Sequence, residues 1–532
     1  MRRCLFLLLL NVVVGFDESG FLHWFTSELR EVCDAPLQFA GTVPTYLENA
    51  TFVQTGPGRF SFGDTRFTHV MDGYSKINTV AFGRGAARYT SQFLRSKFLN
   101  ESMAKGRIAP SMFVGSVVPP QHWGPAQALG PNDNNYIKMR QIGVQKLLLA
   151  DTMISTAVED NFVTFEHDIR SRLLSLSVPG VPWKDDLEPK ADMCMLGTMA
   201  HGHEDPDTGI FTGAMGCFGM AGSYHVVFTI RPEAPTMRHP LAKISLPKGR
   251  SASYMHDFAA TPRYIVLIAE PLFMDLPKVL EGAPLGRGGL RTTGDETLFQ
   301  IVNREDGSVR TLSAPGFIFG HVVNAWEENA SGDILIDLTW YAANNATTLG
   351  WFNRWQLEYL QEPGVRESWP RSKVMRYRLP ANGSVTWELL FPEEKGRNDF
   401  ETPKINEQYT GLKYCVSYFM QFHSDEYRDG GRNSTIISSS PMGAVGIAKR
   451  NLCTGEVMGW YQANEYPSEI QFVPDPSGTA EDDGVLLGIV FNAKANSSYF
   501  HILDARTMRM IAKADLPIKV PFLIHSSFFP AR

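Results

Sequence analysis

The sequence has few cysteines, no excess of basic charge and no long apolar run, and each shortage excludes a class of protein. Its six cysteines among 532 residues include no Cys-x-x-Cys pair, which argues against a disulfide scaffold and against cysteine-based zinc or redox chemistry. The formal net charge is -6, whereas binding to nucleic acid needs clustered Lys and Arg, so we expect no nucleic-acid partner. No charged linker or low-complexity tract divides the chain.

What the sequence does contain is a succession of short apolar, β-branched and aromatic runs bounded by Gly, Asn, Asp or Pro, a pattern typical of β-strands. With 43% hydrophobic and 20% charged residues, the chain can bury a large core. Asp306-Gly307 and Asn382-Gly383 lie between such runs and predict hairpins. Helical spacing predicts one amphipathic helix, from Arg88 to Lys105. The clearest predicted strands are 224–230, 264–270, 333–341, 484–491 and 498–504.

The pattern therefore indicates an all-β protein. A long chain of hairpins must hide its sheet edges, and closure into a propeller is an economical way to do so. The spacing of the runs is irregular and no propeller repeat motif is visible, so two β-sandwiches remain an alternative on pattern alone.

The N-terminus is typical of a secretory signal peptide. Arg2 and Arg3 precede an apolar stretch over 4–14 and the small residue Gly15, and that stretch is shorter than the roughly 20 residues that span a bilayer. We expect a signal peptide over 1–15, a single domain over 16–532, and a location in the secretory pathway, either secreted or in the lumen of the endoplasmic reticulum. Removal of Cys4 would leave five cysteines, enough for one or two disulfides. Acceptor triplets for N-linked glycans begin at Asn49, Asn100, Asn329, Asn345, Asn382, Asn433 and Asn496.

Four of the thirteen histidines share a sequence context that suggests a metal site. A single histidine in a strand is usually a packed hydrogen-bonding group. His201, His256, His321 and His525, however, each lie at the edge of a different strand-like segment. A propeller brings the inner strands of separate blades together on its axis, and four imidazoles there would suit a transition metal with open coordination positions. Their remaining ring nitrogens would need acceptors, for which Glu401 and Glu469 are candidates.

At this point the sequence resembles the carotenoid cleavage oxygenases, a family that includes the retinoid isomerohydrolase of the visual cycle. The resemblance covers nearly the whole chain after the signal, and the order of its motifs makes it specific. Those motifs are Gly56-Pro57-Gly58, His69 with Asp72-Gly73, AHGHED, YMHDFAATPRYIV, HVVNAWEE, FETPKIN, YPSEIQFVP, EDDGVLL and the histidine of PFLIHSSFFP.

The resemblance implies a seven-bladed β-propeller with a cap of loops and short helices over an axial metal site. It implies one Fe(II) ion per chain, held by His201, His256, His321 and His525, with His203 as a neighbour that points elsewhere. It places outer carboxylates at Glu401 and Glu469, and a third at Asp151, where the family usually has Glu. The shorter side chain of Asp151 is expected to reach His201 or its equivalent less well than Glu would.

The implied activity is oxidative cleavage by a dioxygenase. O2 would split a conjugated double bond of a carotenoid, apocarotenoid or related apolar alkene into two carbonyl products, and the tunnel mouth would contact a membrane peripherally. Two alternatives remain: retinoid ester isomerisation and hydrolysis with the same iron, or a secreted non-catalytic propeller that binds carotenoid or lipid. His69 and Asp72 suggest acid and base chemistry, but a turn expected at Gly56-Pro57-Gly58 and the Asp72-Gly73 step favour a structural role.

Overall fold

The structure is a computed structural model and describes residues 18–111, 113–121, 133–151, 155–158, 193–219, 222–235, 238–343, 354–360, 370–391, 399–422, 426–427, 434–435 and 445–531. The predicted signal peptide and the glycan acceptors Asn345 and Asn433 lie outside these residues. Each of the five clearest predicted strands is a strand in the structure, and both predicted hairpins form. The protein is mostly β-structure with few helices.

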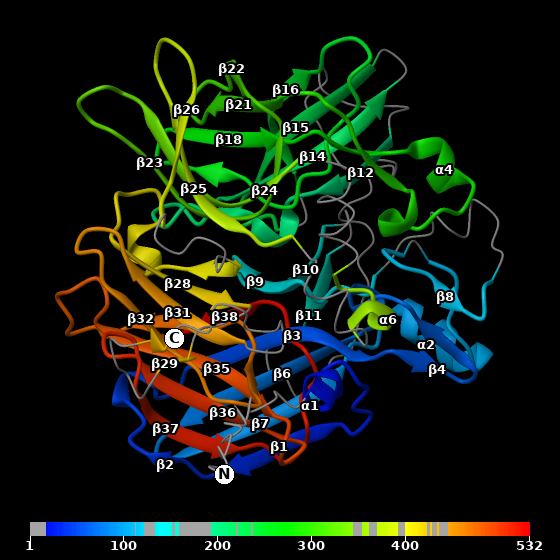
Figure 1. Ribbon diagram of the computed structural model, residues 1–532, viewed down its shortest axis with the longest axis vertical. Coiled ribbons are helices and arrows are strands. Elements are labelled where there is room, and N and C mark those ends of the chain that lie inside the picture. Colours follow the sequence, from blue (N-terminus) through cyan, green and yellow to red (C-terminus); the bar gives the residue numbers. More distant parts are fainter. Residues whose placement is uncertain are drawn as a thin grey trace, which may run out of the picture.

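The strands form antiparallel sheets that follow one another along the chain (Figure 1). The first sheet contains β1 Val32–Leu37, β7 Ala86–Phe93, β6 Tyr74–Gly83, β3 Thr51–Arg59 and β38 Ser526–Phe529. The second contains β9 Lys138–Ile142, β10 Gln145–Leu149 and β11 Thr156–Val158. The third contains β12 Met193–Gly197, β13 His203–Glu204, β14 Phe211–Gly219, β15 Gly222–Ile230 and β16 His239–Ser245.

Four-stranded sheets continue this order. One contains β17 Ala259–Ala260, β18 Tyr264–Ala269, β21 Thr297–Asn303 and β22 Val309–Ala314, and the next β23 Phe317–Glu327, β24 Ile334–Ala342, β25 Lys373–Leu379 and β26 Thr386–Leu389. A third contains β27 Phe400–Lys404, β28 Val416–Gln421, β31 Gly446–Asn451 and β32 Val457–Trp460. The last large sheet contains β33 Glu465–Pro467, β34 Gln471–Pro474, β35 Gly484–Asn492, β36 Ser497–Asp504, β37 Met510–Asp515 and β2 Ala40–Gly41. The small sheets are β4 Ser61–Phe62 with β5 Thr65–Phe67 and β8 Val117–Val118, β19 Leu272–Met274 with β20 Leu290–Thr292, and β29 Glu426–Tyr427 with β30 Ser434–Thr435.

The two ends of the chain complete each other's sheets. The C-terminal strand β38 pairs with β3 in the first sheet, and the N-terminal strand β2 pairs with β37 in the last. Figure 1 shows the early blue and late red strands side by side at the bottom of the view. An apolar core lies between each sheet and the next along the chain, and another joins the last sheet to the first through Phe52, Val80, Leu487 and Phe500. The large sheets therefore pack face to face in a closed ring, which favours a propeller over two sandwiches.

Short helices lie outside these sheets. They are α1 Glu18–His23, α2 Lys97–Lys105, α4 Leu276–Leu280, α6 Leu357–Leu360 and the 3₁₀ turns η1 Thr45–Leu47, η2 Val70–Asp72, η4 Met199–His201, η5 Leu285–Arg287 and η7 Glu407–Tyr409. The helix predicted over Arg88 to Lys105 was wrong in its first half. Residues there continue β7, and the helix begins only after Ser96, whose hydroxyl accepts a hydrogen bond from the backbone N–H of Leu99. Gly56-Pro57-Gly58 was expected in a turn, but it lies within β3.

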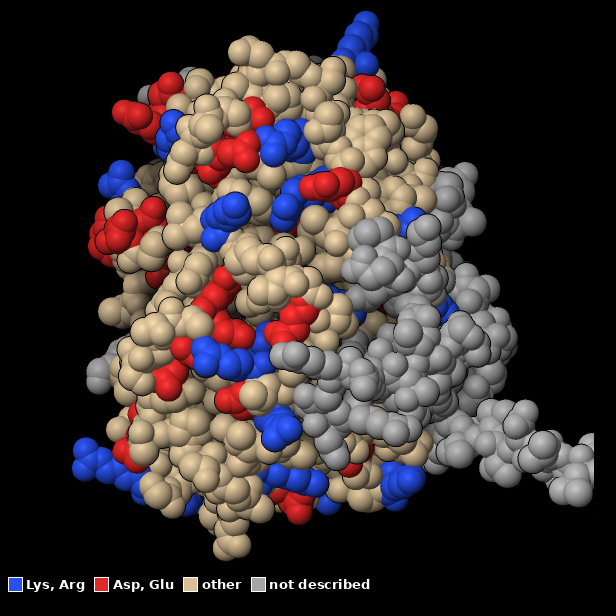
Figure 2. Space-filling view, turned by 60° about the vertical axis from the view of Figure 1, so that its left-hand side comes forward, with Lys and Arg blue, Asp and Glu red and all other residues tan. Residues whose placement is uncertain are grey.

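Two disulfides join the described cysteines, Cys194 to Cys217 across β12 and β14, and Cys415 to Cys453, while Cys33 is free and exposed. Within the described ranges, no helix is both long and apolar enough to span a bilayer. On the face drawn in Figure 2, Lys and Arg are interspersed with Asp and Glu among uncharged residues.

Candidate metal centre

The four histidines predicted from the sequence come together in the structure. His201 ends η4, His321 lies in β23, and His525 directly precedes β38. His256 lies in the connection between β16 and β17. One ring nitrogen from each of the four lies within 4.8 Å of the others. Residues more than three hundred positions apart in the chain therefore meet at one point.

Three of the four imidazoles are oriented by a carboxylate. Asp151 lies 2.7 Å from Nδ1 of His256, while Nδ1 of His321 lies 2.8 Å from Glu401. The distance from Nδ1 of His525 to Glu469 is also 2.8 Å. A carboxylate in this position accepts a hydrogen bond from the Nδ1–H group, so the lone pair of Nε2 is left for a metal.

Asp151 contacts one of the equivalent ligand histidines and not His201 itself. Its carboxylate pairs with His256 rather than His201, and the short side chain reaches this ring directly. His201 has no hydrogen-bonded carboxylate among the described residues, since the nearest one, on Asp257, lies 3.9 Å from its Nδ1.

The inner nitrogens are suited to a metal ion and poorly satisfied without one. Nε2 of His201 and Nε2 of His525 are buried and have no hydrogen-bond partner in the described structure, and Nε2 of His256 lies 3.3 Å from Nε2 of His321. Buried polar atoms normally have partners. Four inward-facing imidazole nitrogens are a donor set that binds borderline transition metals such as iron, so these residues fit a metal ion.

Burial keeps two of the rings neutral. Burial and the neighbouring imidazoles hold the pKa of His201 well below its usual value, and burial lowers the pKa of His525 to about 3 despite the nearby Glu469. For His256, burial also lowers the pKa, but the charge and hydrogen bond of Asp151 together with the charges of Asp257 and Glu401 outweigh burial, and the pKa is raised. A neutral imidazole is the form that binds metal.

His203 points away from this cluster. Its Nε2 lies 3.0 Å from the backbone carbonyl oxygen of Phe258, and burial lowers the pKa of the ring to about 4. His201 ends the 3₁₀ turn η4 whereas His203 begins β13, so the two rings point in different directions although they are only two residues apart.

Several supporting residues were not found from the sequence. Tyr254 donates a hydrogen bond of 2.7 Å to Asp151, and Tyr341 donates one to Glu401. Ser526 donates to Glu469 from its backbone N–H at 2.6 Å and from its hydroxyl at 2.8 Å. Lys404 forms an ion pair of 3.2 Å with Glu469. Tyr254 and Ser526 are close in sequence to His256 and His525, which is the one signal that would have suggested them.

Backbone irregularities place these side chains. The pairing of β23 with β24 shifts on both sides of Val322, next to His321, and the pairing of β27 with β28 shifts between Glu401 and Lys404. Thr402, inside this second shift, has a φ of 48°. Such β-bulges re-aim side chains and are common beside functional sites.

A cavity of about 210 Å³ opens beside three of the four histidines, His256, His321 and His525. Asp151, His256, His321, Glu401 and His525 line one part of it. The remainder is largely aromatic and aliphatic, with Tyr136, Ile137, Leu285, Trp355, Met420, Phe422, Phe522 and Ile524.

His69 and Asp72 also line this cavity, but Nδ1 of His69 and both carboxylate oxygens of Asp72 accept hydrogen bonds from backbone N–H groups. Nδ1 of His69 accepts a hydrogen bond from the backbone N–H of Met71 at 3.1 Å and caps η2. Asp72 accepts hydrogen bonds of 2.7 Å from the N–H groups of Val114 and Gly115. These contacts are those of the structural role that the turn residues favoured.

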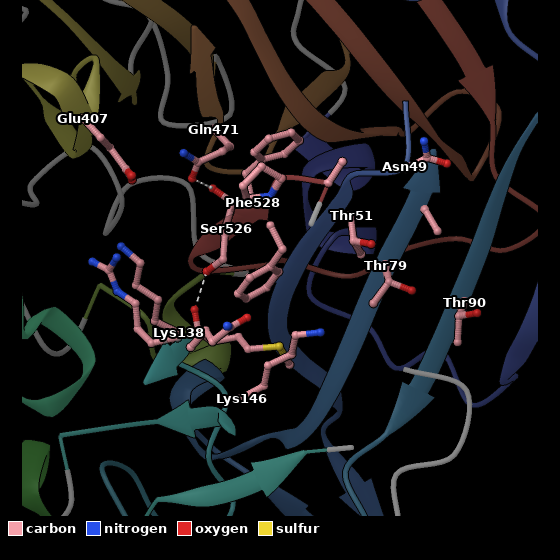
Figure 3. Close-up of a pocket in the computed structure, with 18 of the residues that line it drawn as sticks. Asn49, Thr51, Thr79, Thr90, Lys138, Lys146, Glu407, Gln471, Ser526 and Phe528 are labelled. Carbon is pink, nitrogen blue, oxygen red and sulfur yellow. Dashed lines mark hydrogen bonds between the residues drawn. The ribbon is translucent and has the colours of Figure 1, made fainter. Parts of the chain in front are cut away.

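A second, more polar cavity of about 720 Å³ is lined by β9, η7 and the residues around β38 (Figure 3). Lys138, Glu407, Gln471 and Ser526 line one part of it, and Asn49, Thr51, Thr79 and Thr90 line another. Ser526, which lines this cavity, directly follows His525 in the chain.

Comparisons with known proteins agree on one family. The family profile described as retinal pigment epithelial membrane protein matches residues 26–530. The mitochondrial carotenoid-cleaving dioxygenase of Pongo abelii is 26% identical over 92% of this chain and 91% of its own length. The carotenoid isomerooxygenase of Galleria mellonella is 27% identical over 96% of each chain.

Solved structures show the same fold. A variant of the Synechocystis apocarotenoid oxygenase superposes with a TM-score of 0.75 at 21% identity, covering 97% of this chain and 99% of the other. A cobalt-substituted form of that enzyme gives a TM-score of 0.74 at 20% identity.

Proposed function

This chain belongs to the retinal pigment epithelial membrane protein family of carotenoid oxygenases and retinoid isomerohydrolases, and from that premise we propose that it is an iron(II)-dependent dioxygenase. Its reaction is the cleavage of one conjugated double bond of a carotenoid or apocarotenoid. One molecule of O2 supplies one oxygen atom to each of the two carbonyl products. The convergence of four imidazoles beside an apolar cavity is the observation that carries this proposal.

The metal in this proposal is one Fe(II) per chain, held by His201, His256, His321 and His525. Bound iron would supply the electron-transfer chemistry with O2 that alkene cleavage requires. Asp151, Glu401 and Glu469 fix the orientation of three ligand rings and provide negative charge that four neutral imidazoles lack. Because these carboxylates already hold the rings in position, the ligand side chains need to rearrange less when the metal binds.

The apolar lining selects the substrate. Burial of a polyene against aromatic rings such as Trp355 and Phe522 removes apolar surface from water, which contributes roughly 25 cal/mol per Å². A cavity of about 210 Å³ receives the segment of an extended molecule that lies beside the histidines. The position of that segment determines which double bond is cleaved, and the same walls exclude water from the reacting atoms.

We interpret the ring of sheets as seven blades of a propeller, because seven sheets in chain order share successive apolar cores and the last packs on the first. The short helices and loops beside the ring form the cap over the metal site in this interpretation. The whole of 16–532 is then one domain.

Secretory processing is a separate part of the proposal. The glycan acceptors Asn49, Asn100, Asn329, Asn382 and Asn496 are all exposed, as attachment of an N-linked glycan requires. Protein secreted from a eukaryotic host should lose mass on glycosidase treatment and should begin near residue 16. An unchanged mass, or an intact N-terminus, would contradict this assignment.

Peripheral membrane contact at the cavity mouth follows from the substrate class, because a polyene is delivered from lipid rather than from water. The protein should sediment with phosphatidylcholine vesicles that contain carotenoid. Full recovery in the supernatant would contradict the contact.

The test of function is incubation of iron-loaded protein with a panel of carotenoids and apocarotenoids in air, with products identified by mass spectrometry. We expect paired aldehydes or ketones in air and none without O2. Retinol released from a retinyl ester without O2 would indicate the isomerohydrolase alternative. Tight carotenoid binding without any product would indicate a binding protein.

A further inference from the structure

We propose that Lys404 is a positioning residue for the metal centre: its ammonium group fixes Glu469 and thereby sets the electron donation of His525 to a bound ion. This inference rests on the proposed metal site but not on the identity of the substrate. It adds to the site a cation that the sequence did not reveal.

A chain of short contacts joins Lys404 to the histidine cluster. Nζ of Lys404 lies 3.2 Å from Oε2 of Glu469, and Oε1 of Glu469 lies 2.8 Å from Nδ1 of His525. The side chains of Lys404 and Glu469 are only 9% and 2% exposed. An ion pair shielded from water in this way is much stronger than a surface pair and is little screened by salt.

The bulge in β27 makes this arrangement possible. In a regular strand, residues three apart point to opposite faces. The pairing shift between Glu401 and Lys404, with Thr402 at a φ of 48°, lets both flanking side chains reach the site. One strand thus contacts two ligand systems: Glu401 holds His321 directly, and Lys404 holds His525 through Glu469.

Lys404 is distinguished from the other lysine on this side of the cluster. Lys138 lines the second cavity (Figure 3), and burial lowers its pKa well below the usual value. Among the described residues, it is Lys404 whose ammonium group forms an ion pair with Glu469. Arg140, Lys138 and Lys404 together lower the pKa of nearby Glu407, although burial raises it.

The effect of the ion pair between Lys404 and Glu469 follows from the charges around the metal centre. Three carboxylates hydrogen-bond to ligand imidazoles, and the positive charge of Lys404 leaves two net negative charges, equal in size to the charge of a divalent ion. Without Lys404, Glu469 still accepts three hydrogen bonds, from His525 and twice from Ser526, and these keep it ionised. Glu469 would then draw the Nδ1 proton of His525 more strongly, and the imidazole would donate more electron density to the metal.

The measurement is the Fe(III)/Fe(II) midpoint potential of iron-loaded protein, obtained by spectroelectrochemistry without substrate. In Lys404→Met, the loss of a nearby cation favours Fe(III), so we expect the potential to fall by about 59 mV for each tenfold change in the Fe(III)/Fe(II) equilibrium. We expect a change of roughly tenfold. Lys404→Arg, which keeps the charge, should stay near the wild-type potential, and Lys404→Gln should shift in the same direction as Lys404→Met.

Lys449→Met is the matched control. Lys449 lies in the same sheet, is fully buried and pairs with Asp482 at 2.7 Å, but contacts none of the four histidines or their carboxylates in the described structure. This variant should lose stability and keep its potential. An unchanged or higher potential in iron-loaded Lys404→Met would overturn the proposal, as would loss of folding in both Lys404→Met and Lys404→Gln. A wild-type chain that binds iron but cleaves no carotenoid would refute the proposed reaction and leave this inference standing.

Discussion

The carboxylate of Glu401 occupies the space that a side chain at Gly320 would need. A Cβ atom on residue 320 would collide with both carboxylate oxygens, so glycine at this position lets Glu401 reach the ring of His321. The metal centre therefore depends on a residue that contributes no ligand atom.

We expect Gly320→Ala to displace Glu401 and lower metal affinity by roughly 10- to 100-fold, the usual loss when an outer partner of a ligand is disturbed. Competition with a metal chelator measures this affinity. Gly294→Ala is the control, since a Cβ there has no neighbour within 4 Å and its backbone is not left-handed. Equal affinities in the two variants would refute the role of Gly320.

Glu469→Gln tests the carboxylate that holds His525. The amide keeps the size of the side chain but loses the charge, so iron affinity or turnover should fall by roughly 10- to 100-fold. Chelator competition and initial rates measure the two effects. Wild-type affinity together with wild-type turnover would show that Glu469 does not support the metal.

Trp355→Ala tests the apolar wall. In the cavity lining, the ring centroid of Trp355 lies 5.0 Å from that of Phe522 and 5.6 Å from that of Phe422. Its removal takes away contact surface that ground and transition states share, so KM should rise by roughly tenfold while kcat changes little. Trp387→Ala, at an exposed site on β26, should leave KM unchanged. A fall in kcat without a rise in KM would contradict a binding role for Trp355.

The stability of the protein should depend on pH through Asp72. Burial raises the pKa of this carboxyl to about 7, although two backbone N–H groups donate hydrogen bonds to it. In the unfolded chain the pKa of Asp is roughly 3.9. Between these two pKa values the folded state therefore binds more protons than the unfolded state. The free energy of unfolding consequently falls as the pH rises from about 4 to 7. In Asp72→Asn, the decline of Tm over this range should be smaller than in the wild type. Parallel Tm profiles would exclude Asp72 as the cause.

The four histidines could be predicted because each lies in a motif whose order along the chain is preserved, and because strands of a closed ring converge on its axis. The partner of Asp151 could not be predicted in the same way. Which ring a carboxylate faces depends on how neighbouring sheets are rotated, and the sequence records only that Asp151 precedes all four histidines.

Other features depended on local backbone geometry. The residues before Lys97 fit helical spacing, but pairing with β6 makes them a strand, so tertiary contacts override the local pattern. Lys404 was missed because alternation in a regular strand would point it away from Glu401. The bulge that brings both side chains inward, where Thr402 has a φ of 48°, has no sequence signature.

Iron analysis of the purified protein and its histidine variants tests the central claim most directly. We expect one iron per chain in the wild type, almost none in folded His256→Ala and His525→Ala, and a full complement in His203→Ala, whose ring contacts the backbone of Phe258 instead. Circular dichroism would confirm that the variants are folded. Full iron content in His256→Ala and His525→Ala would contradict a metal centre built from these four imidazoles.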